Sequence, residues 1–170
     1  MTDKNAQTPY LLRPADQQAI DEVTFVHQHN PNGIRHTRTL TDALGFEDMG
    51  VHLVRLVQGN DSSELHYHEE DEEFIYVISG RGTTQIADEV YDIGPGDFMA
   101  FPKNSPAHNM HNPYSEDLVY LVGGTRAPID ICNYPDKGLR QFRVHGQREW
   151  TETKNLTRGA SRILHKDKTK

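Results

Sequence analysis

Cysteine is almost missing from this chain: among its 170 residues only Cys132 carries a thiol. A single cysteine cannot form a disulfide within the chain, so the fold must rely on a hydrophobic core, and the chain is long enough to bury one. The lack of cysteine pairs agrees with a reducing compartment. We interpret Cys132 itself as a small buried hydrophobic residue.

Long apolar runs are missing as well. The mean hydropathy is −0.75, and no segment approaches the roughly 18 apolar residues that a membrane-spanning helix needs. Residues 1–5 are polar and lead into no apolar segment of the kind found in signal peptides. We therefore expect a cytoplasmic protein with no membrane partner.

Positive charge is in short supply. The chain has 18 Lys and Arg against 25 Asp and Glu, a formal net charge of −7. Binding to nucleic acid depends on a basic surface that neutralises phosphates, so we expect no nucleic-acid partner. Basic residues gather only near the C-terminus, where we expect a solvated tail: Lys154, Arg158, Arg162, Lys166, Lys168 and Lys170.

The middle of the chain has the pattern of an all-β protein. Short apolar and β-branched runs alternate with clusters of Gly, Pro, Asn, Asp and Ser that suit tight turns. The runs predict strands at residues 51–57, 73–78, 83–87, 98–101 and 118–122. Short strands without intervening helices predict an antiparallel sandwich or barrel.

The remainder of the chain flanks this middle part. We expect an N-terminal arm at residues 1–45, with a strand within 20–26 that pairs with a second subunit in a homodimer, and a helical turn at 41–45 between Thr41 and Gly45. The barrel is expected at residues 46–127. Residues 128–170 are expected to fold back over the barrel and to end in the basic tail.

Four residues have the chemistry of a metal site. On an extended strand, side chains two residues apart point to the same face, so His66 and His68 project together. Glu73 opens an apolar strand, where a buried carboxylate needs a cationic partner. His108 follows the predicted strand at 98–101, which a closed barrel brings close to the others.

Two motifs around these residues resemble those of the cupin family. The first family motif consists of Gly, His-x-His, Glu and Gly, and it resembles the set Gly59, His66, His68, Glu73 and Gly80 of this chain. The second consists of Gly, Pro, His and Asn, and it resembles the set Gly96, Pro102, His108 and Asn112. The resemblance covers roughly residues 46–126. It implies a double-stranded β-helix, or jelly-roll barrel, in which His66, His68, Glu73 and His108 bind one metal ion.

Two further details accompany the resemblance. The stretch from Pro102 to His108 is one residue longer than in the family pattern, which leaves His111 as an alternative fourth ligand. Residues 120–126, Asp130 and residues 134–136 are similar to a group of bacterial single-domain cupins without a characterised reaction.

Three imidazoles and one carboxylate suit a divalent transition metal rather than Ca²⁺ or Mg²⁺. We favour Fe or Mn, and Ni, Co or Zn also fit. Four protein ligands leave open coordination positions, as in catalytic sites. We therefore expect a metal-dependent enzyme that acts on a small polar molecule, with dioxygenase chemistry first. The alternatives are a non-catalytic binding or sensing protein, or a metal-dependent isomerase or lyase.

Other polar residues have less certain roles. Tyr76, His111 and Glu64 are candidates for a general base. Arg55 lies in an apolar run, where it either binds a substrate carboxylate or points outward. Arg126 and Asp130 are expected to form an ion pair that closes one end of the barrel. The remaining histidines, including His27, are expected to be structural or exposed.

Overall fold

The computed structural model describes residues 10–157 and 159 of the chain. Nearly half of this part is strand and its helices are short, which agrees with the all-β class that the sequence predicts. The elements follow one another in the order α1 Pro14–Ala19, β1 Val23–Val26, β2 Ile34–Thr39, η1 Asp42–Leu44, β3 Met49–Leu56, β4 Tyr67–His68, β5 Glu73–Ser79, β6 Gly82–Ile86, β7 Glu89–Ile93, β8 Phe98–Phe101, β9 His108–His111, β10 Leu118–Thr125, β11 Ile129–Tyr134, η2 Pro135–Lys137, β12 Leu139–Val144, β13 Gln147–Glu152 and η3 Thr153–Asn155.

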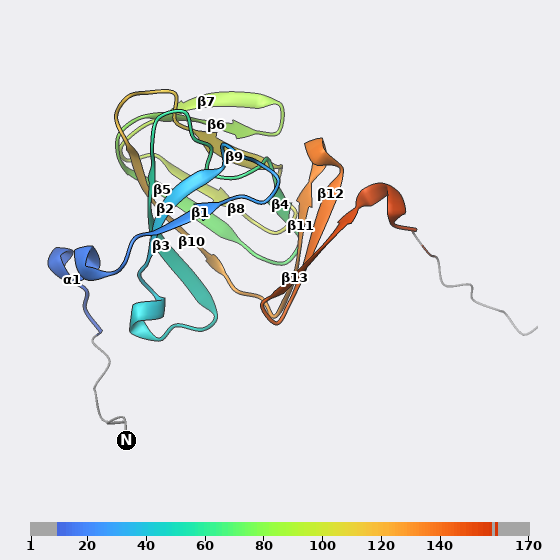
Figure 1. Cartoon of the computed structure of the whole chain (residues 1–170), viewed down its shortest axis with the longest axis horizontal. Coiled ribbons are helices and arrows are strands. Elements are labelled where there is room, and N and C mark those ends of the chain that lie inside the picture. Colours follow the sequence, from blue (N-terminus) through green and yellow to red (C-terminus); the bar gives the residue numbers. More distant parts are fainter. Residues whose placement is uncertain (1–9, 158, 160–170) are drawn as a thin grey trace, which may run out of the picture.

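The strands form three antiparallel sheets. A six-stranded sheet has the order β1-β2-β3-β10-β5-β8, a three-stranded sheet the order β7-β6-β9, and a four-stranded sheet the order β13-β12-β11-β4. The first two enclose the barrel, and strands β11 to β13 stand at its side (Figure 1). Among the described residues, no helix is long and apolar enough to cross a membrane.

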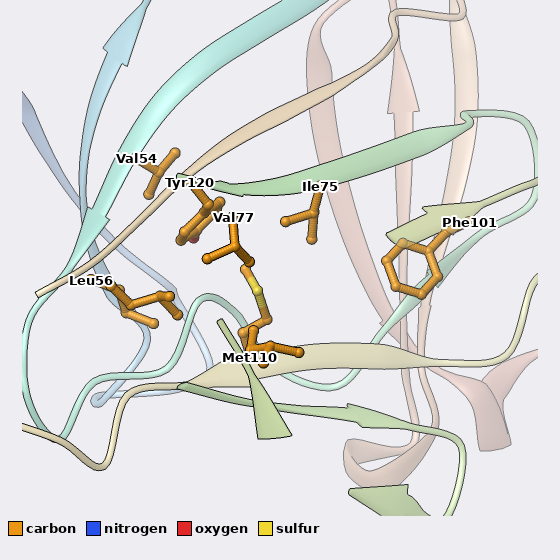
Figure 2. Packing of buried hydrophobic residues seen from close by; sticks show 9 residues of the cluster. Val54, Leu56, Ile75, Val77, Phe101, Met110 and Tyr120 are labelled. Carbon is orange, nitrogen blue, oxygen red and sulfur yellow. The ribbon is translucent and has the colours of Figure 1, made fainter. Parts of the chain in front are cut away.

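The core fills the space between the six-stranded and three-stranded sheets. Side chains from β3, β5 and β10 face Met110 of β9 across this space, and Figure 2 shows their packing. Apolar residues at alternate strand positions, such as Ile75 and Val77, point to the same side of the sheet and are buried. Alternation along the strands therefore determines which face of each strand enters the core.

The segments outside the predicted strands contribute more β-structure than the sequence indicates. The N-terminal segment forms two strands, β1 and β2, which extend the barrel sheet through the pairing of β2 with β3. After residue 124 the chain forms β11 to β13, and β11 pairs with β4. Polar side chains dominate β2, and β12 has equal numbers of polar and apolar residues, so neither strand stands out by hydrophobicity.

The predicted turn at 41–45 is a short 3₁₀ helix, and Gly45 ends it at a φ of 76°. Thr41 does not cap this turn with its side chain. Its hydroxyl instead accepts a hydrogen bond from the backbone N–H of Val51 at 2.8 Å. The side chain of Thr41 therefore connects the turn to the neighbouring strand β3 and does not cap the turn.

Candidate metal centre

Backbone pairing brings two of the predicted ligands side by side. His66 and His108 form an isolated antiparallel bridge, with backbone hydrogen bonds of 3.1 and 2.8 Å between them. Glu73 begins β5, opposite Phe101 at the end of β8. The ring of Phe101 stacks on that of His108 at a centroid distance of 3.5 Å. The imidazole of His108 is therefore fixed beside the start of β5.

The ligand atoms of His66, Glu73 and His108 lie within 4.8 Å of one another. His108 Nε2 lies 3.4 Å from Glu73 Oε1, but it is buried and has no hydrogen-bond partner among the described residues. A buried polar atom without a partner is costly, and a bound cation would remove that cost. His68 does not belong to this group of three atoms; its ligand atom groups with those of His66 and Cys132.

Hydrogen bonds orient the rings so that each Nε2 is free. Nδ1 of His66 lies 2.9 Å from the carbonyl oxygen of Glu64, and Nδ1 of His68 lies 2.7 Å from Oδ2 of Asp130. Because these oxygens only accept hydrogen bonds, each of the two Nδ1 atoms carries a proton, and Nε2 is the nitrogen that a metal would use. Nδ1 of His108 faces the carbonyl oxygen of Pro106 at 3.4 Å.

Asp130 is the residue that positions His68. It is buried, and its other oxygen accepts backbone hydrogen bonds from Glu70 and Asp71, both at 3.1 Å. The expected pair between Arg126 and Asp130 is therefore wrong: Arg126 binds Asp42 instead. The carboxylate of Asp130 is turned inward, toward the imidazole of His68, and cannot reach the surface guanidinium.

The electrostatics of the cluster follow from burial and from neighbouring charges. Burial lowers the pKa of His66 to about 3, and the adjacent imidazoles of His108 and His68 act in the same direction. Burial alone raises the pKa of Glu73, but His108 and His66 together lower it to about 2. An ionised carboxylate thus lies beside a neutral imidazole, the protonation states in which both bind metal.

The pKa of His68 shifts the other way. Burial lowers it, but the hydrogen bond to Asp130 and the neighbouring Cys132 together raise it to about 11. Cys132 is buried, as expected, and its Sγ lies 4.0 Å from Nε2 of His68.

Other candidates from the sequence lie away from this cluster. His111 forms an ion pair with Asp61 at 2.8 Å. Arg55 binds Glu22 and Asp117, which leaves it turned toward the surface.

The cluster opens into a cavity of about 1020 Å³ between the barrel and strands β11 to β13. His66, His68, Glu73 and His108 all line it, whereas the base candidates Tyr76, His111 and Glu64 do not. This volume is at the upper end of ordinary small-molecule sites. The arrangement can therefore hold a metal ion at the base of a cavity large enough for a substrate.

Comparison with known proteins identifies the family. Residues 52–124 match the family model of the cupin domain. A solved structure from Acidithiobacillus ferrooxidans, of a protein provisionally named a sugar phosphate isomerase, has 35% sequence identity and a TM-score of 0.83. The match covers 92% of this chain and 97% of that one. The chain belongs to the cupin superfamily.

Two further relatives extend the comparison. A solved structure from Silicibacter pomeroyi, of a cupin named a sugar phosphate isomerase, has 29% identity and a TM-score of 0.75 and covers 84% of this chain and 94% of that one. An uncharacterised protein of Methanocaldococcus jannaschii is 30% identical over 71 residues, which is 42% of this chain. The matched residues of this chain span 49%, or about half, of the length of that curated relative.

An aromatic group forms another part of the wall of the cupin cavity. His27, Tyr134 and Trp150 all line the cavity, and the ring of Tyr134 lies 5.4 Å from that of His27 and 5.0 Å from that of Trp150. The ring of Tyr134 also stacks on that of His66 at 5.8 Å. This group therefore connects the ligand cluster with the β1 to β2 connection.

His27 is held as a neutral hydrogen-bond donor. Its Nδ1 accepts the backbone N–H of His29 at 3.2 Å, so the ring proton is on Nε2. Burial lowers the pKa of His27 to about 4, and the positive charges of Arg35, His29 and Lys137 contribute. No sequence pattern separates His27 from the structural histidines, because its place beside Tyr134 depends on tertiary pairing.

Four arginines line the same cavity, and two of them, Arg35 on β2 and Arg148 on β13, have no carboxylate partner among the described residues, unlike Arg126 and Arg143. The positive charges of Arg35 and Arg148 reach Tyr134, where they oppose the rise in pKa that burial causes. Neither residue belongs to a recognisable motif, and they are 113 positions apart in the chain. Nothing in the sequence alone indicates that they share a cavity.

The donor set of this cupin fits a transition metal. The ligand atoms of His66, Glu73 and His108 converge, His68 belongs to a neighbouring group that shares His66, and acceptors hold the Nδ1 protons of His66 and His68. Such outer hydrogen bonds fix the tautomer of metal-binding histidines. Hard cations such as Ca²⁺ prefer oxygen ligands throughout.

Proposed function

We propose that this cupin is a metal-dependent isomerase that acts on a phosphorylated sugar. The observation that carries the proposal is the convergence of His66, Glu73 and His108 within 4.8 Å, at a cavity of about 1020 Å³. The two solved cupins that cover most of this chain are both named sugar phosphate isomerases, which supports the substrate class.

In this proposal His66, His68, Glu73 and His108 hold one divalent transition metal, with Fe or Mn favoured. The metal supplies Lewis acidity toward the carbonyl and hydroxyl oxygens of the sugar. Asp130 keeps the proton of His68 on Nδ1, so that Nε2 remains a ligand. The cavity walls exclude water from the reacting atoms.

His27 has the properties of a positioning donor in this scheme. Isomerisation between an aldose and a ketose moves protons between adjacent carbons and oxygens, with no net oxidation. A neutral imidazole whose Nε2 carries the proton can donate a hydrogen bond to a substrate oxygen without carrying charge. Tyr134 also keeps its proton, because burial raises its pKa.

The sequence favoured a dioxygenase and kept an isomerase among the alternatives. The names of the two solved relatives support the isomerase. An isomerase is compatible both with these names and with the histidine and carboxylate ligands, so we prefer isomerisation to oxygen chemistry. The non-catalytic alternative is a binding or sensing protein. Measured turnover would distinguish an isomerase or a dioxygenase from it.

The test is an assay of the purified protein loaded with Mn²⁺ or Fe²⁺ on a panel of aldose and ketose phosphates in D₂O. We expect interconversion of one aldose and ketose pair, with deuterium entering the carbon next to the carbonyl group. NMR detects both the product and the deuterium. The His66→Ala, His68→Ala double variant should lose this activity. An oxygen electrode run in parallel detects dioxygenase chemistry.

Oxygen consumption without isomerisation would reverse our preference. Stabilisation by a sugar phosphate with no turnover under either metal would favour the sensing protein. His111→Ala is the matched control, because His111 pairs with Asp61 outside the cavity. It should keep full activity if His108 is the fourth ligand.

We also propose that two copies associate. Strand β1 lies at the edge of the six-stranded sheet, and its side chains Val23 and Val26 are 61% and 56% exposed. An exposed apolar edge strand is a surface that proteins usually cover. Light scattering after gel filtration should give twice the chain mass of 19.4 kDa, and cell fractionation tests the predicted cytoplasmic location.

A further inference from the structure

Two arginines in the cavity are exceptions to a general pattern of charge pairing. Apart from the exposed Arg13, the other arginines in the described part of the chain bind carboxylates, as seen for Arg38, Arg55, Arg81, Arg126, Arg140 and Arg143. For Arg35 and Arg148, no carboxylate of a described residue lies within ion-pair distance. The chain carries a net charge of −7, so carboxylates are abundant. Unpaired arginines facing one cavity therefore need another explanation.

Arg35 is held in place while most of its donors stay free. It lies on β2, its guanidinium carbon lies 4.4 Å from the ring centroid of Phe25, and Nη1 donates to the carbonyl oxygen of Ser62 at 2.7 Å. A guanidinium has five N–H donors. Only this one hydrogen bond to a described residue is formed, which leaves an oriented, partly desolvated cation at the cavity wall.

Arg148 approaches the cavity from a different sheet. It lies on β13 and is exposed, and it forms no hydrogen bond with a described side chain. Trp150, two residues further along the same strand, lines the cavity as well. Because β2 and β13 belong to different sheets, the two cations reach the cavity from different walls.

We propose that Arg35 and Arg148 form an anion site in this cavity that binds the phosphate group of the substrate. Guanidinium groups bind phosphate through paired N–H donors, and two of them match its charge and its several acceptor oxygens. The site rests on the function proposed above, since it assigns a phosphate position in the same cavity. It is separate from the metal ligands, none of which is an arginine.

The experiment measures binding of inorganic phosphate and of a sugar alcohol phosphate to the metal-loaded protein by calorimetry. Arg35→Met and Arg148→Met should each weaken binding of both probes about tenfold or more, since each removes a charge-assisted contact. Arg81→Met is the matched control, because Arg81 binds Glu116 outside the cavity. The unphosphorylated sugar alcohol should bind all four proteins equally.

Additional variants separate the site from a folding defect and from the metal. Arg148 is exposed, so its replacement should leave the melting temperature unchanged. Arg35→Lys keeps the charge but loses the paired donors, and its affinity for phosphate should fall between those of wild type and Arg35→Met. Phosphate affinity that is unchanged in Arg35→Met and Arg148→Met, or that depends only on the metal, would overturn the proposal.

The result is distinguishable from failure of the proposed function. Arginine-dependent phosphate binding without isomerisation of any sugar phosphate supports the anion site and removes the isomerase. Isomerisation with an unchanged KM in both arginine variants supports the isomerase and removes the anion site.

Discussion

At the scale of single residues, Asp130 determines how His68 is presented. Its carboxylate binds Nδ1 of His68 at 2.7 Å and is itself held by two backbone N–H groups. We predict that Asp130→Asn weakens metal affinity about tenfold to a hundredfold, since such outer partners fix ring orientation and basicity. Competition with a chelator measures the affinity.

Asp42→Asn is the control for this prediction. It removes the partner of Arg126, and Asp42 itself is exposed and does not line the cavity. Circular dichroism shows whether both variants are folded. Equal metal affinity in Asp130→Asn and wild type would mean that His68 needs no outer partner.

His27 gives a pH dependence whose sign follows from its environment. Burial holds the pKa of His27 near 4, below the ordinary histidine value of 6.5. The unfolded chain therefore binds a proton that the folded chain does not, between pH 6.5 and 4. The stabilisation is complete above pH 6.5 and is lost as the pH falls, by about 2 kcal/mol between pH 7 and 5.

His27→Asn tests this contribution, because the Asn carbonyl can still accept the His29 N–H but does not titrate. Urea unfolding at pH 7 and pH 5 gives the free energy of unfolding of each protein. We expect a smaller difference between the two pH values in the variant. The same difference in both proteins would contradict a neutral buried His27.

At the scale of elements, the turn between β5 and β6 depends on Gly80. Its φ is +77°, and an added Cβ would lie 2.1 Å from the carbonyl oxygen of Asp117. We predict that Gly80→Ala lowers the free energy of unfolding by about 3 kcal/mol or more, because backbone strain and a clash with main-chain atoms add together. Chemical denaturation measures the change.

Gly146 provides a matched comparison. Its φ is +83°, and an added Cβ would meet nothing within 4 Å. Gly146→Ala should therefore cost only the conformational strain, about 1 kcal/mol. Equal effects at the two positions would show that the contact with Asp117 relaxes without cost.

At the scale of the whole molecule, the cluster lies where the three sheets meet. Glu73 begins β5 in the six-stranded sheet, His108 begins β9 in the three-stranded sheet, and His68 ends β4 in the four-stranded sheet. A metal bound by these residues joins all three sheets. It would therefore stabilise the folded state as a whole, by an amount that grows with the logarithm of its concentration relative to Kd.

We predict that a metal concentration of about 100 times Kd raises the melting temperature by roughly 5–10 °C, from a gain of about 2.7 kcal/mol. The His66→Ala, His68→Ala double variant should show no rise, and His111→Ala should behave as wild type. Scanning calorimetry with and without metal measures the shift. A rise of equal size in the double variant would place the metal elsewhere.

Much of the barrel and the choice of His66, Glu73 and His108 followed from the sequence alone. Alternating apolar residues report which strand face enters the core, and this signal is local. It located β3, β5, β6, β8 and β10. The spacing of His66 and His68 and the motif around His108 are also local features, so they needed no knowledge of the fold.

The tertiary structure alone decided the surroundings of the site. Asp130 reaches His68 across 62 positions of sequence, and Arg35 and Arg148 share a cavity only because β2 and β13 bound it from different sheets. Strand pairing over such separations depends on the closure of the whole barrel. No local pattern encodes it, so the carboxylate behind His68 and the shared position of the two cations appear only once the chain is folded.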